Sequence, residues 1–477
     1  MQNINKNFLL LFISLFIAIS YLILHSSTNP LIMGRADSSV FLTVGFSWTE
    51  NLIPYRDIFD HKGPVLYLIN ALGFLICNEF YGVLLLEAIF LSINIILFFL
   101  LCDKNKYSFI LSLIFIAFYF NKVFEDGNLT EEYAITFNLI AIFIFTKQYP
   151  IRFYSYGFLG GLLFLLRPNL AAPTLAVFFI DFLRSRHYKP VTNILKCAIG
   201  FTAVLLPTAV YFYSENALTD FINCFLIFNV KYAGISKQNF LYVEMLHIIK
   251  NAYIYIPLTI IYVLIAKKNF SLFIENLAIF IFSLLMTAIS GRSYLHYFML
   301  TIPSILLTIA TYIKLYNTDT LVIEAVNKYK EQLYALKQNI FSSPKILVLL
   351  CCLVIASGVY YVFSIYTTLN TTKLENIRNF FYQNGITQES SILNLANHTA
   401  TKIFYILKIP PREKDFFPET ASITGKYTEL LKQDTLLCPK EEYDLVIIPQ
   451  DKKFQCPQYS RFDTPLSDLM IYKRNAQ

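Results

Sequence analysis

The chain has 477 residues, of which 56% are hydrophobic and only 15% are charged. Soluble domains carry about 25% charged residues, so this composition excludes a soluble globular protein and indicates a polytopic membrane protein. The net charge of +7 is modest and lies mainly in one set of loops, so it reflects membrane topology and does not indicate nucleic acid as a partner.

The first apolar stretch, residues 8–24, is long enough to cross a bilayer. Residues 25–30, which follow it, offer no cleavage site of the small-x-small type, and further apolar stretches come later. We therefore expect a retained signal anchor at this position.

Ten more apolar stretches follow the first. They cover residues 79–102, 108–124, 133–146, 153–166, 170–183, 194–213, 245–266, 271–290, 297–312 and 346–366. Together they predict a mainly α-helical membrane bundle of about eleven crossings. The short connections rich in Lys and Arg all fall on one side, which the positive-inside rule assigns to the cytoplasm. The N-terminus is then cytoplasmic, and the tail is extracytoplasmic.

Two apolar segments are too short for the crossings that they would have to supply. Residues 153–183 begin and end beside cytoplasmic charges, yet about 31 residues cannot form two spans of ~20 residues. They must rise partway and return, with the turn at Arg167-Pro168-Asn169, where proline breaks the helix. Residues 64–77 predict an interfacial or re-entrant helix. Broken helices of this kind line protein or aqueous cavities, so we expect a pocket that opens outward.

The tail differs in kind from the rest of the chain. It carries charges of both signs and short β-like runs, so we predict a transmembrane domain over residues 1–366 and a small extracytoplasmic α/β domain over residues 367–477. Cys438 and Cys456 lie in this tail, and an oxidising compartment favours a disulfide between them. The other cysteines fall mostly in apolar stretches and are interpreted as packing residues.

Charged side chains gather in the loop between the first span and residue 64. Asp37 is a candidate active-site residue, although a solvated or capping aspartate would look the same. Lys62 precedes the predicted interfacial helix, where it could meet a lipid phosphate or extend to the head groups. Asp57 and Asp60 are three residues apart and would share a face if this segment were helical; capping explains them equally well.

Later charged residues add to this set. Glu131 and Glu132 open a predicted helix, where acids are also favoured by the helix dipole. Arg167 lies between two apolar half-helices, and a charge inside the membrane indicates function by default. Arg292 and His296 belong to a polar cluster in a short external turn, which would also suit an interfacial anchor.

The ordered set of these segments resembles the integral-membrane GT-C glycosyltransferases. The likeness rests on Tyr55-Arg56-Asp57-Ile58-Phe59-Asp60-His61-Lys62-Gly63-Pro64-Val65-Leu66-Tyr67, Glu131-Glu132-Tyr133, Leu165-Leu166-Arg167-Pro168-Asn169 and Gly291-Arg292-Ser293-Tyr294-Leu295-His296-Tyr297. It covers roughly residues 1–303. It is strongest to the bacterial branch related to protein mannosyltransferases and to the aminoarabinose transferases of lipid A.

The resemblance implies a multi-pass enzyme of the bacterial plasma (inner) membrane. Such enzymes move a sugar from a polyprenyl-phosphate carrier to a glycan, lipid or protein acceptor outside the cytoplasm, for example in lipopolysaccharide. The base then falls on Asp37, the second acidic position on Glu131 or Glu132, and the donor-phosphate contacts on Lys62, Arg167, Arg292 and His296. Many relatives have two adjacent acids in the first loop, whereas Asp37 lies between Ala36 and Ser38. The sequence therefore leaves open whether the enzyme uses a divalent metal.

The chemistry of transfer agrees with these residue types. An ionised aspartate can accept the proton of an acceptor hydroxyl, and fixed cations can stabilise the leaving phosphate. A single displacement would invert the anomeric centre.

The sequence also leaves two other functions open. One is a transporter or flippase of a lipid-linked or anionic solute, although repeated interrupted helices are lacking. The other is an O-antigen polymerase or ligase, which concentrates its key residues in a late external loop.

Overall fold

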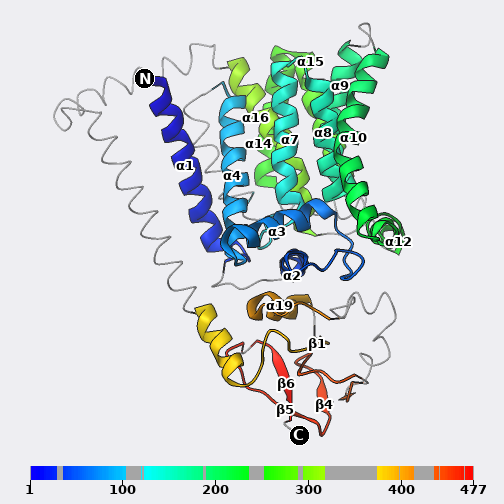
Figure 1. The fold of residues 1–477 in the computed structure, drawn as a ribbon. Helices are drawn as coiled ribbons and strands as arrows, with labels where there is room; N and C mark the ends of the chain where they lie inside the picture. The colour runs from blue at the N-terminus through cyan, green and yellow to red at the C-terminus, as the bar shows by residue number, and fades with distance from the viewer. Residues whose placement is uncertain are drawn as a thin grey trace, which may run out of the picture.

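The structure is a computed structural model of the 477-residue chain. It describes residues 2–29, 36–103, 120, 123–185, 190–235, 252–287, 294–316, 373–396, 398–412, 435–439, 441–466 and 468–475. Within these ranges a helical bundle is followed by a smaller C-terminal part that contains the β-strands (Figure 1). The bundle is the larger of the two.

The bundle is built from long apolar helices that run roughly parallel or antiparallel to one another (Figure 1). They are α1 (Gln2–His25), α4 (Tyr81–Leu101), α7 (Thr130–Lys147), α8 (Arg152–Leu166), α9 (Ala172–Ser185), α10 (Pro190–Ser214), α14 (Ala252–Lys268), α15 (Phe270–Thr287) and α16 (Ile302–Tyr316). Short 3-10 helices precede two of them: η2 (Pro168–Ala171) leads into α9, and η5 (Leu295–Thr301) leads into α16.

Four helices in the described ranges are long and apolar enough to cross a membrane. They are α4, α10, α15 and the combined helix Leu295–Tyr316. Shorter apolar helices accompany them, and the predicted spans 108–124 and 346–366 lie largely or wholly outside the described residues. The count of about eleven crossings therefore stays a prediction.

The interruption predicted at Arg167 is present. Helix α8 has 15 residues and α9 has 14, so each is about 22 Å long at 1.5 Å per residue, shorter than a ~30 Å hydrocarbon core. Arg167 itself is extended, and Pro168 opens the short helix η2. Pro168 thus interrupts the helix, so that α8 and α9 do not form one continuous span.

Three further helical segments lie at the end of the bundle that faces the C-terminal part. They are α2 (Ala36–Thr49), α3 (Pro64–Cys77) and the stretch made of α11 (Leu218–Phe221), a π-helix (Ile222–Ile227) and α12 (Phe228–Ile235). Helix α3 lies across the bundle axis (Figure 1) and has the bounds that the sequence predicts. It leaves Leu68, Leu72, Leu75 and Ile76 exposed, as expected of an interfacial helix. The sequence pattern predicts neither α2 nor the helical segments over residues 218–235.

The C-terminal part contains two small sheets. The strands are β1 (Ile392–Asn394), β2 (Thr435–Leu437), β3 (Leu445–Ile448), β4 (Lys453–Gln455), β5 (Tyr459–Arg461) and β6 (Met470–Arg474). The larger sheet has the order β1-β3-β6-β5, in which β1 and β3 are parallel and the other pairs antiparallel. All four residues of β3 are buried, because both faces of this central strand are covered. These strands, with helix α19 (Lys402–Leu407), form an α/β fold as expected.

A disulfide joins the two strands of the smaller sheet. Strands β2 and β4 are parallel, with Leu437 opposite Gln455. The residues that follow these two therefore also lie opposite each other. These residues are Cys438 and Cys456, whose Cα atoms are 4.8 Å apart and whose sulfurs are bonded. Two strands of three residues bury little surface, and the covalent link holds them together.

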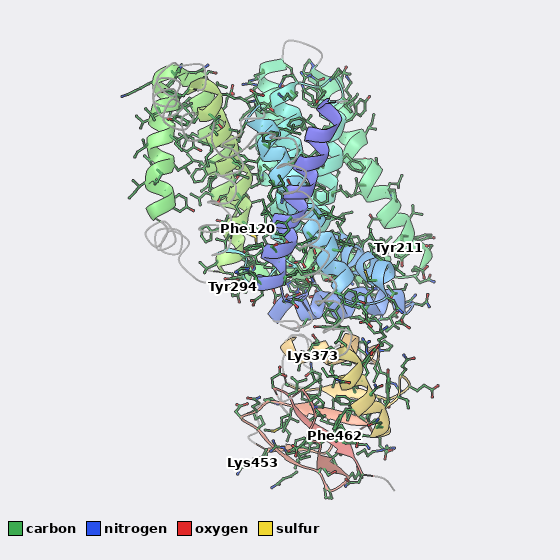
Figure 2. All side chains as sticks on the ribbon, turned by 90° about the vertical axis from the view of Figure 1, so that its left-hand side faces the viewer. Phe120, Tyr211, Tyr294, Lys373, Lys453 and Phe462 are labelled. Carbon is green, nitrogen blue, oxygen red and sulfur yellow. A yellow bond between two sulfur atoms is a disulfide. The ribbon has the colours of Figure 1, made fainter. Side chains whose placement is uncertain are left out.

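The C-terminal part packs against the end of the bundle. The carboxylate of Glu79, just before α4, accepts two hydrogen bonds from Arg378, at 2.5 and 2.9 Å, and pairs with Lys408 at 3.2 Å. The Thr43 hydroxyl of α2 donates to the Thr401 carbonyl at 3.1 Å. Figure 2 labels Tyr294 and Tyr211 towards the end of the bundle that is nearer to the C-terminal part. Helix α2 is thereby enclosed between the two parts.

Candidate active site

Asp37 lies in the first turn of α2, and its side chain is partly exposed. The expectation of a loop at this position is wrong, since the chain is helical from Ala36 onward. The sequence of α2 mixes small polar and apolar residues without a clear helical period, so its helicity depends on tertiary packing. An acid in a first turn is favoured by the positive end of the helix dipole.

Lys62 lies opposite this turn. Its Nζ atom is 6.0 Å from the centre of the Phe41 ring, and Phe41 is one helical turn after Asp37 on the same face of α2. The main chain of Lys62 is held by two tyrosines: its amide donates to the Tyr67 hydroxyl at 3.0 Å, and its carbonyl accepts from the Tyr55 hydroxyl at 2.7 Å. The lysine backbone is therefore fixed while its side chain reaches the site.

A direct backbone contact brings Lys62 to Arg167. The amide of Gly63 donates to the Leu166 carbonyl at 3.0 Å, so the loop before α3 lies against the end of α8. A Cβ atom on Gly63 would lie 1.8 Å from the Leu165 carbonyl oxygen. Only glycine permits this approach, which makes Lys62 and Arg167 neighbours although they are far apart in sequence.

Arg167 is held by an acid and an aromatic ring. Its Nη1 atom is 2.7 Å from Glu131 Oε1, and its guanidinium lies 4.3 Å from the centre of the Tyr297 ring. Glu131 is buried, whereas Arg167 keeps 17% of its side-chain surface exposed. The cost of placing this charge between half-helices is thus offset by a charge-assisted hydrogen bond and a cation–π contact.

The electrostatics of the loop before α3 follow from these neighbours. Burial is the largest influence on Lys62 and opposes its charged form, but Asp37, Tyr297 and Asp60 together outweigh it and raise the lysine pKa above its ordinary value. Burial and then the charge of Lys62 lower the pKa of His61. Burial also opposes ionisation of Asp60, yet the hydrogen bond from His61 and the charge of Lys62 lower the pKa of that carboxyl. At neutral pH, Lys62 is a cation, His61 is neutral and Asp60 is ionised.

Asp57 and Asp60 do not share a helical face. Residues 50–63 are not helical, and Asn51 and Tyr55 have positive φ angles of 66° and 73°, which interrupt any helix there. Asp57 pairs with its neighbour Arg56 at 2.8 Å. Asp60 instead contacts His61 at 3.2 Å and accepts from the Tyr67 hydroxyl at 2.6 Å. Of the two, Asp60 is the one linked to Lys62.

Glu131 and Glu132 open α7 as predicted, but they face different surroundings. Glu131 meets Arg167, whereas Glu132 Oε2 accepts from the Asn128 amide at 2.8 Å. That same amide donates to Glu87 Oε1 at 2.8 Å, so the two carboxyls Glu87 and Glu132 lie together in a buried position. Successive residues on a helix point about 100° apart, which separates the two acids of α7.

Asn128 connects this acid pair to the helix that carries Asp37. Its side-chain amide donates to Ser38 on α2 at 3.1 Å and exchanges hydrogen bonds with Asn70 on α3, at 2.9 and 3.2 Å. Ser26, after α1, donates to Glu87 at 3.0 Å. A single buried polar network thus holds α2, α3, α4 and α7 in register around the site.

The polar cluster before α16 lies beside this arrangement. His296 Nδ1 contacts the carboxylate of Glu125, and Tyr297, the next residue, stacks on Arg167. The carboxylate of Glu131 interacts electrostatically with His296 as well as with Arg167 and Lys62. Arg292 lies outside the described residues.

Within the described ranges, no three His, Cys, Asp or Glu side chains form a group that could hold a metal ion. Each acid of the site lies near a cation: Asp37 lies near Lys62, and Glu131 forms an ion pair with Arg167. Lys62 and Arg167 also lie close enough to repel each other. Two adjacent cations with partly exposed side chains form a site suited to a phosphate group.

Three parts of the site are not indicated by the sequence patterns. Tyr297 falls among the possible interfacial anchors, although its ring covers Arg167. Glu87 is missed, although a single acid inside an apolar stretch is costly and signals a buried partner. The contact of Gly63 with α8 has no sequence signal beyond the glycine itself.

A bundle of apolar helices, with helices lying across one end and an α/β part beyond them, defines an integral-membrane protein with the GT-C fold (Figure 1). ArnT from Cupriavidus metallidurans bound to undecaprenyl phosphate shares it, with a TM-score of 0.63 and 10% identity over 99% of this chain and 98% of ArnT. For the apo state of the same ArnT, the TM-score is 0.56 with 13% identity over 94% of each chain. No protein-family model and no curated protein matches the sequence. The expected resemblance is thus confirmed at the level of the fold.

Proposed function

We propose that this protein is a membrane glycosyltransferase that moves a sugar from a polyprenyl-phosphate carrier to an extracytoplasmic acceptor. The observation that carries the proposal is the convergence of Lys62 and Arg167 beside Asp37 and Glu131, at one end of a membrane bundle. A lipid phosphate needs cations near the membrane surface, and its sugar needs a base within reach. One of the similar ArnT structures is bound to undecaprenyl phosphate, a ligand of this chemical class.

In the proposed reaction, an acceptor oxygen attacks the anomeric carbon of the sugar while the bond from that carbon to the phosphate oxygen breaks. The acceptor proton passes to the carboxylate of Asp37, which acts as the general base. Lys62 and Arg167 neutralise the charge that develops on the leaving phosphate. Glu131 holds the Arg167 guanidinium in place through their hydrogen bond. A single displacement of this kind inverts the anomeric centre.

The proposed orientation places the site outside the cytoplasm of a bacterial inner membrane. The connection between α7 and α8 carries Lys147 and Arg152 at the bundle end remote from the C-terminal part (Figure 1). By the positive-inside rule this end is cytoplasmic. The C-terminal part with its disulfide then lies in an oxidising compartment. Nucleotide sugars are scarce there, so a lipid-linked donor suits the location.

Release of polyprenyl phosphate tests this proposal. Purified protein in lipid nanodiscs is incubated with labelled lipid-linked sugars extracted from bacterial membranes, and the sugar-free lipid is measured. We expect release by the wild type and at least tenfold less by Lys62→Ala and Arg167→Ala, because each removes a phosphate contact. Lys267→Ala is the matched control, since Lys267 is exposed in the last turn of α14 and is assigned to the cytoplasmic end. Equal release by all four proteins would contradict the proposal.

The same protein in sealed liposomes separates transfer from transport. A transporter or flippase moves the labelled lipid between leaflets with its sugar–phosphate bond intact. Movement without cleavage would support that alternative, whereas cleavage that depends on Lys62 supports the transferase.

A further inference from the structure

His61 lies between Asp60 and Lys62 and contacts both with its imidazole ring. Its Nδ1 atom is 3.2 Å from Asp60 Oδ1, and its Nε2 atom is 3.5 Å from Lys62 Nζ. Asp60 is buried, and its other oxygen accepts from the Tyr67 hydroxyl at 2.6 Å. A chain of polar groups therefore leads from Tyr67 through Asp60 and His61 to the lysine ammonium.

The two neighbours of the ring select the same tautomer. An ionised carboxylate only accepts hydrogen bonds, so Nδ1 must carry the proton that faces Asp60. A lysine ammonium only donates, so Nε2 must present its lone pair to Lys62. The neutral ring with hydrogen on Nδ1 satisfies both, and each contact reinforces the other.

The rest of His61 is also fixed. Its carbonyl accepts from the Asn229 side-chain amide at 2.7 Å, and its ring lies 5.3 Å from the ring of Phe228. Both contacts come from α12, which therefore packs against the loop before α3. The imidazole is thereby a rigid neighbour for a lysine side chain that has four rotatable carbons.

A hydrogen-bonded Asp–His pair also occurs in hydrolases, where the histidine acts as a general base. A base must offer its free nitrogen to the substrate. Here the Nε2 lone pair faces the ammonium of Lys62, and an adjacent cation opposes protonation of the ring. The geometry therefore favours support of Lys62 over proton transfer.

We infer that His61 is a positioning residue that aims the Lys62 ammonium at the phosphate of the lipid carrier, and that Asp60 fixes the imidazole for this role. The inference rests on the proposed function, because it assigns Lys62 to the donor phosphate. It predicts that the acceptor atom of His61 matters for phosphate binding, and that its basicity does not.

Two neutral substitutions separate the two nitrogen atoms of the ring. In His61→Gln, the side-chain oxygen can reach the place of Nε2 and accept from Lys62. In His61→Asn, the shorter amide reaches only the place of Nδ1, so the contact with Asp60 is kept and the contact with Lys62 is lost. The measurement is the binding of labelled undecaprenyl phosphate to purified full-length protein in nanodiscs.

We expect His61→Asn to weaken binding about tenfold, as for loss of a hydrogen bond to a charged group, and His61→Gln to restore most of it. In a Lys62→Ala background, His61→Asn should have no further effect, because His61 acts through Lys62. Thermal unfolding and size-exclusion profiles check that each variant folds, and His61→Ala replaces His61→Asn if the latter does not.

Three outcomes would decide against the inference. Equal binding by His61→Asn and wild type would overturn it, as would equal losses in the Gln and Asn variants. Additive losses in the Lys62→Ala background would assign His61 a role independent of Lys62 and also overturn it. If Lys62→Ala alone left binding unchanged, the donor-phosphate assignment in the proposed function would fail instead, so the two failures are distinguishable.

Discussion

Single residues define the site through pairs of opposite charge. Asp37 faces Lys62, and Glu131 faces Arg167, while Glu132 turns away to Glu87. The sequence could nominate both acids of the Glu131-Glu132 pair but could not choose between them. Neighbouring helical residues point in different directions, and only the position of α8 decides which of them meets an arginine.

Asp37→Asn tests the proposed base. The amide keeps the size of the side chain and can still form hydrogen bonds, but it cannot accept the proton of an acceptor hydroxyl. We expect the rate of transfer to fall by at least ~10²-fold, the usual scale of general base catalysis, with no change in expression. Asp57→Asn is the matched control, because Asp57 pairs with Arg56 instead. Near-normal turnover in Asp37→Asn would return attention to Glu131 and Asp60.

The pKa shifts around Lys62 predict how stability depends on pH. His61 has a pKa below its ordinary 6.5, so below pH 6.5 the unfolded chain binds a proton that the folded chain does not. Stability therefore falls as the pH drops from 6.5 through the folded-state pKa. Lys62 has a pKa above its ordinary 10.5, so its contribution is complete below 10.5 and is lost as the pH rises through the raised value.

The measurement is the thermal unfolding temperature of the purified protein between about pH 5 and pH 9. We expect a decrease on the acid side that is smaller in His61→Gln, which cannot take up the proton. An identical acid dependence in wild type and variant would show that other groups cause it.

At the scale of elements, the site depends on how the loop before α3 meets the end of α8. Proline at position 64 begins α3, and proline at position 168 follows the end of α8, so both ends are set by local chemistry. Their contact through Gly63 is tertiary. Helix α2, which brings Asp37, is held by Asn128 and by the C-terminal part through Thr43.

Gly63→Ala tests this contact. The new methyl group would meet the Leu165 carbonyl oxygen at 1.8 Å, so the loop must move away from α8 and Lys62 must separate from Arg167. We expect at least tenfold less transfer and a lower unfolding temperature, since overpacking costs about 1–3 kcal/mol.

Gly160→Ala is the control for Gly63→Ala. It makes the same change within α8, where a Cβ atom would meet nothing within 4 Å. This variant should keep activity and gain slightly in stability, because alanine favours a helix by up to about 1 kcal/mol over glycine. Equal effects of the two substitutions would argue against a special role for the Gly63 contact.

At the scale of the whole molecule, the fold places the charged site where the membrane bundle meets the C-terminal part. Glu79 anchors Arg378 and Lys408 at this boundary, and α19 packs beneath α2. The C-terminal part thus covers the end of the bundle at which the charged site lies. Whether the proposed acceptor is extracytoplasmic depends on which side of the membrane this boundary faces.

Thiol labelling tests that orientation. Cysteine at Glu50, exposed just after α2, should react with an impermeant reagent in intact spheroplasts. Cysteine at Gln148, exposed between α7 and α8, should react only after lysis. Among the described cysteines, the background lacks the partly exposed Cys77 and Cys197 but keeps the disulfide. Labelling of position 148 from outside would reverse the topology and remove the reason for a lipid-linked donor.

The sequence by itself determined the membrane class, the bounds of α3, the break at Arg167 and the acidic start of α7. These features depend on local properties: the length of an apolar stretch, the position of a proline, and charge at a helix end. They would be the same in many tertiary arrangements.

Only the tertiary structure decided that α2 is helical, that Glu131 and not Glu132 meets Arg167, and that Lys62 lies near both Asp37 and Arg167. Each of these depends on packing between distant segments, which sets the direction of a side chain and supplies the stability that a 14-residue helix lacks alone. A charged side chain acquires its partner only when the fold removes both from water, and the sequence does not state which pairs are buried together.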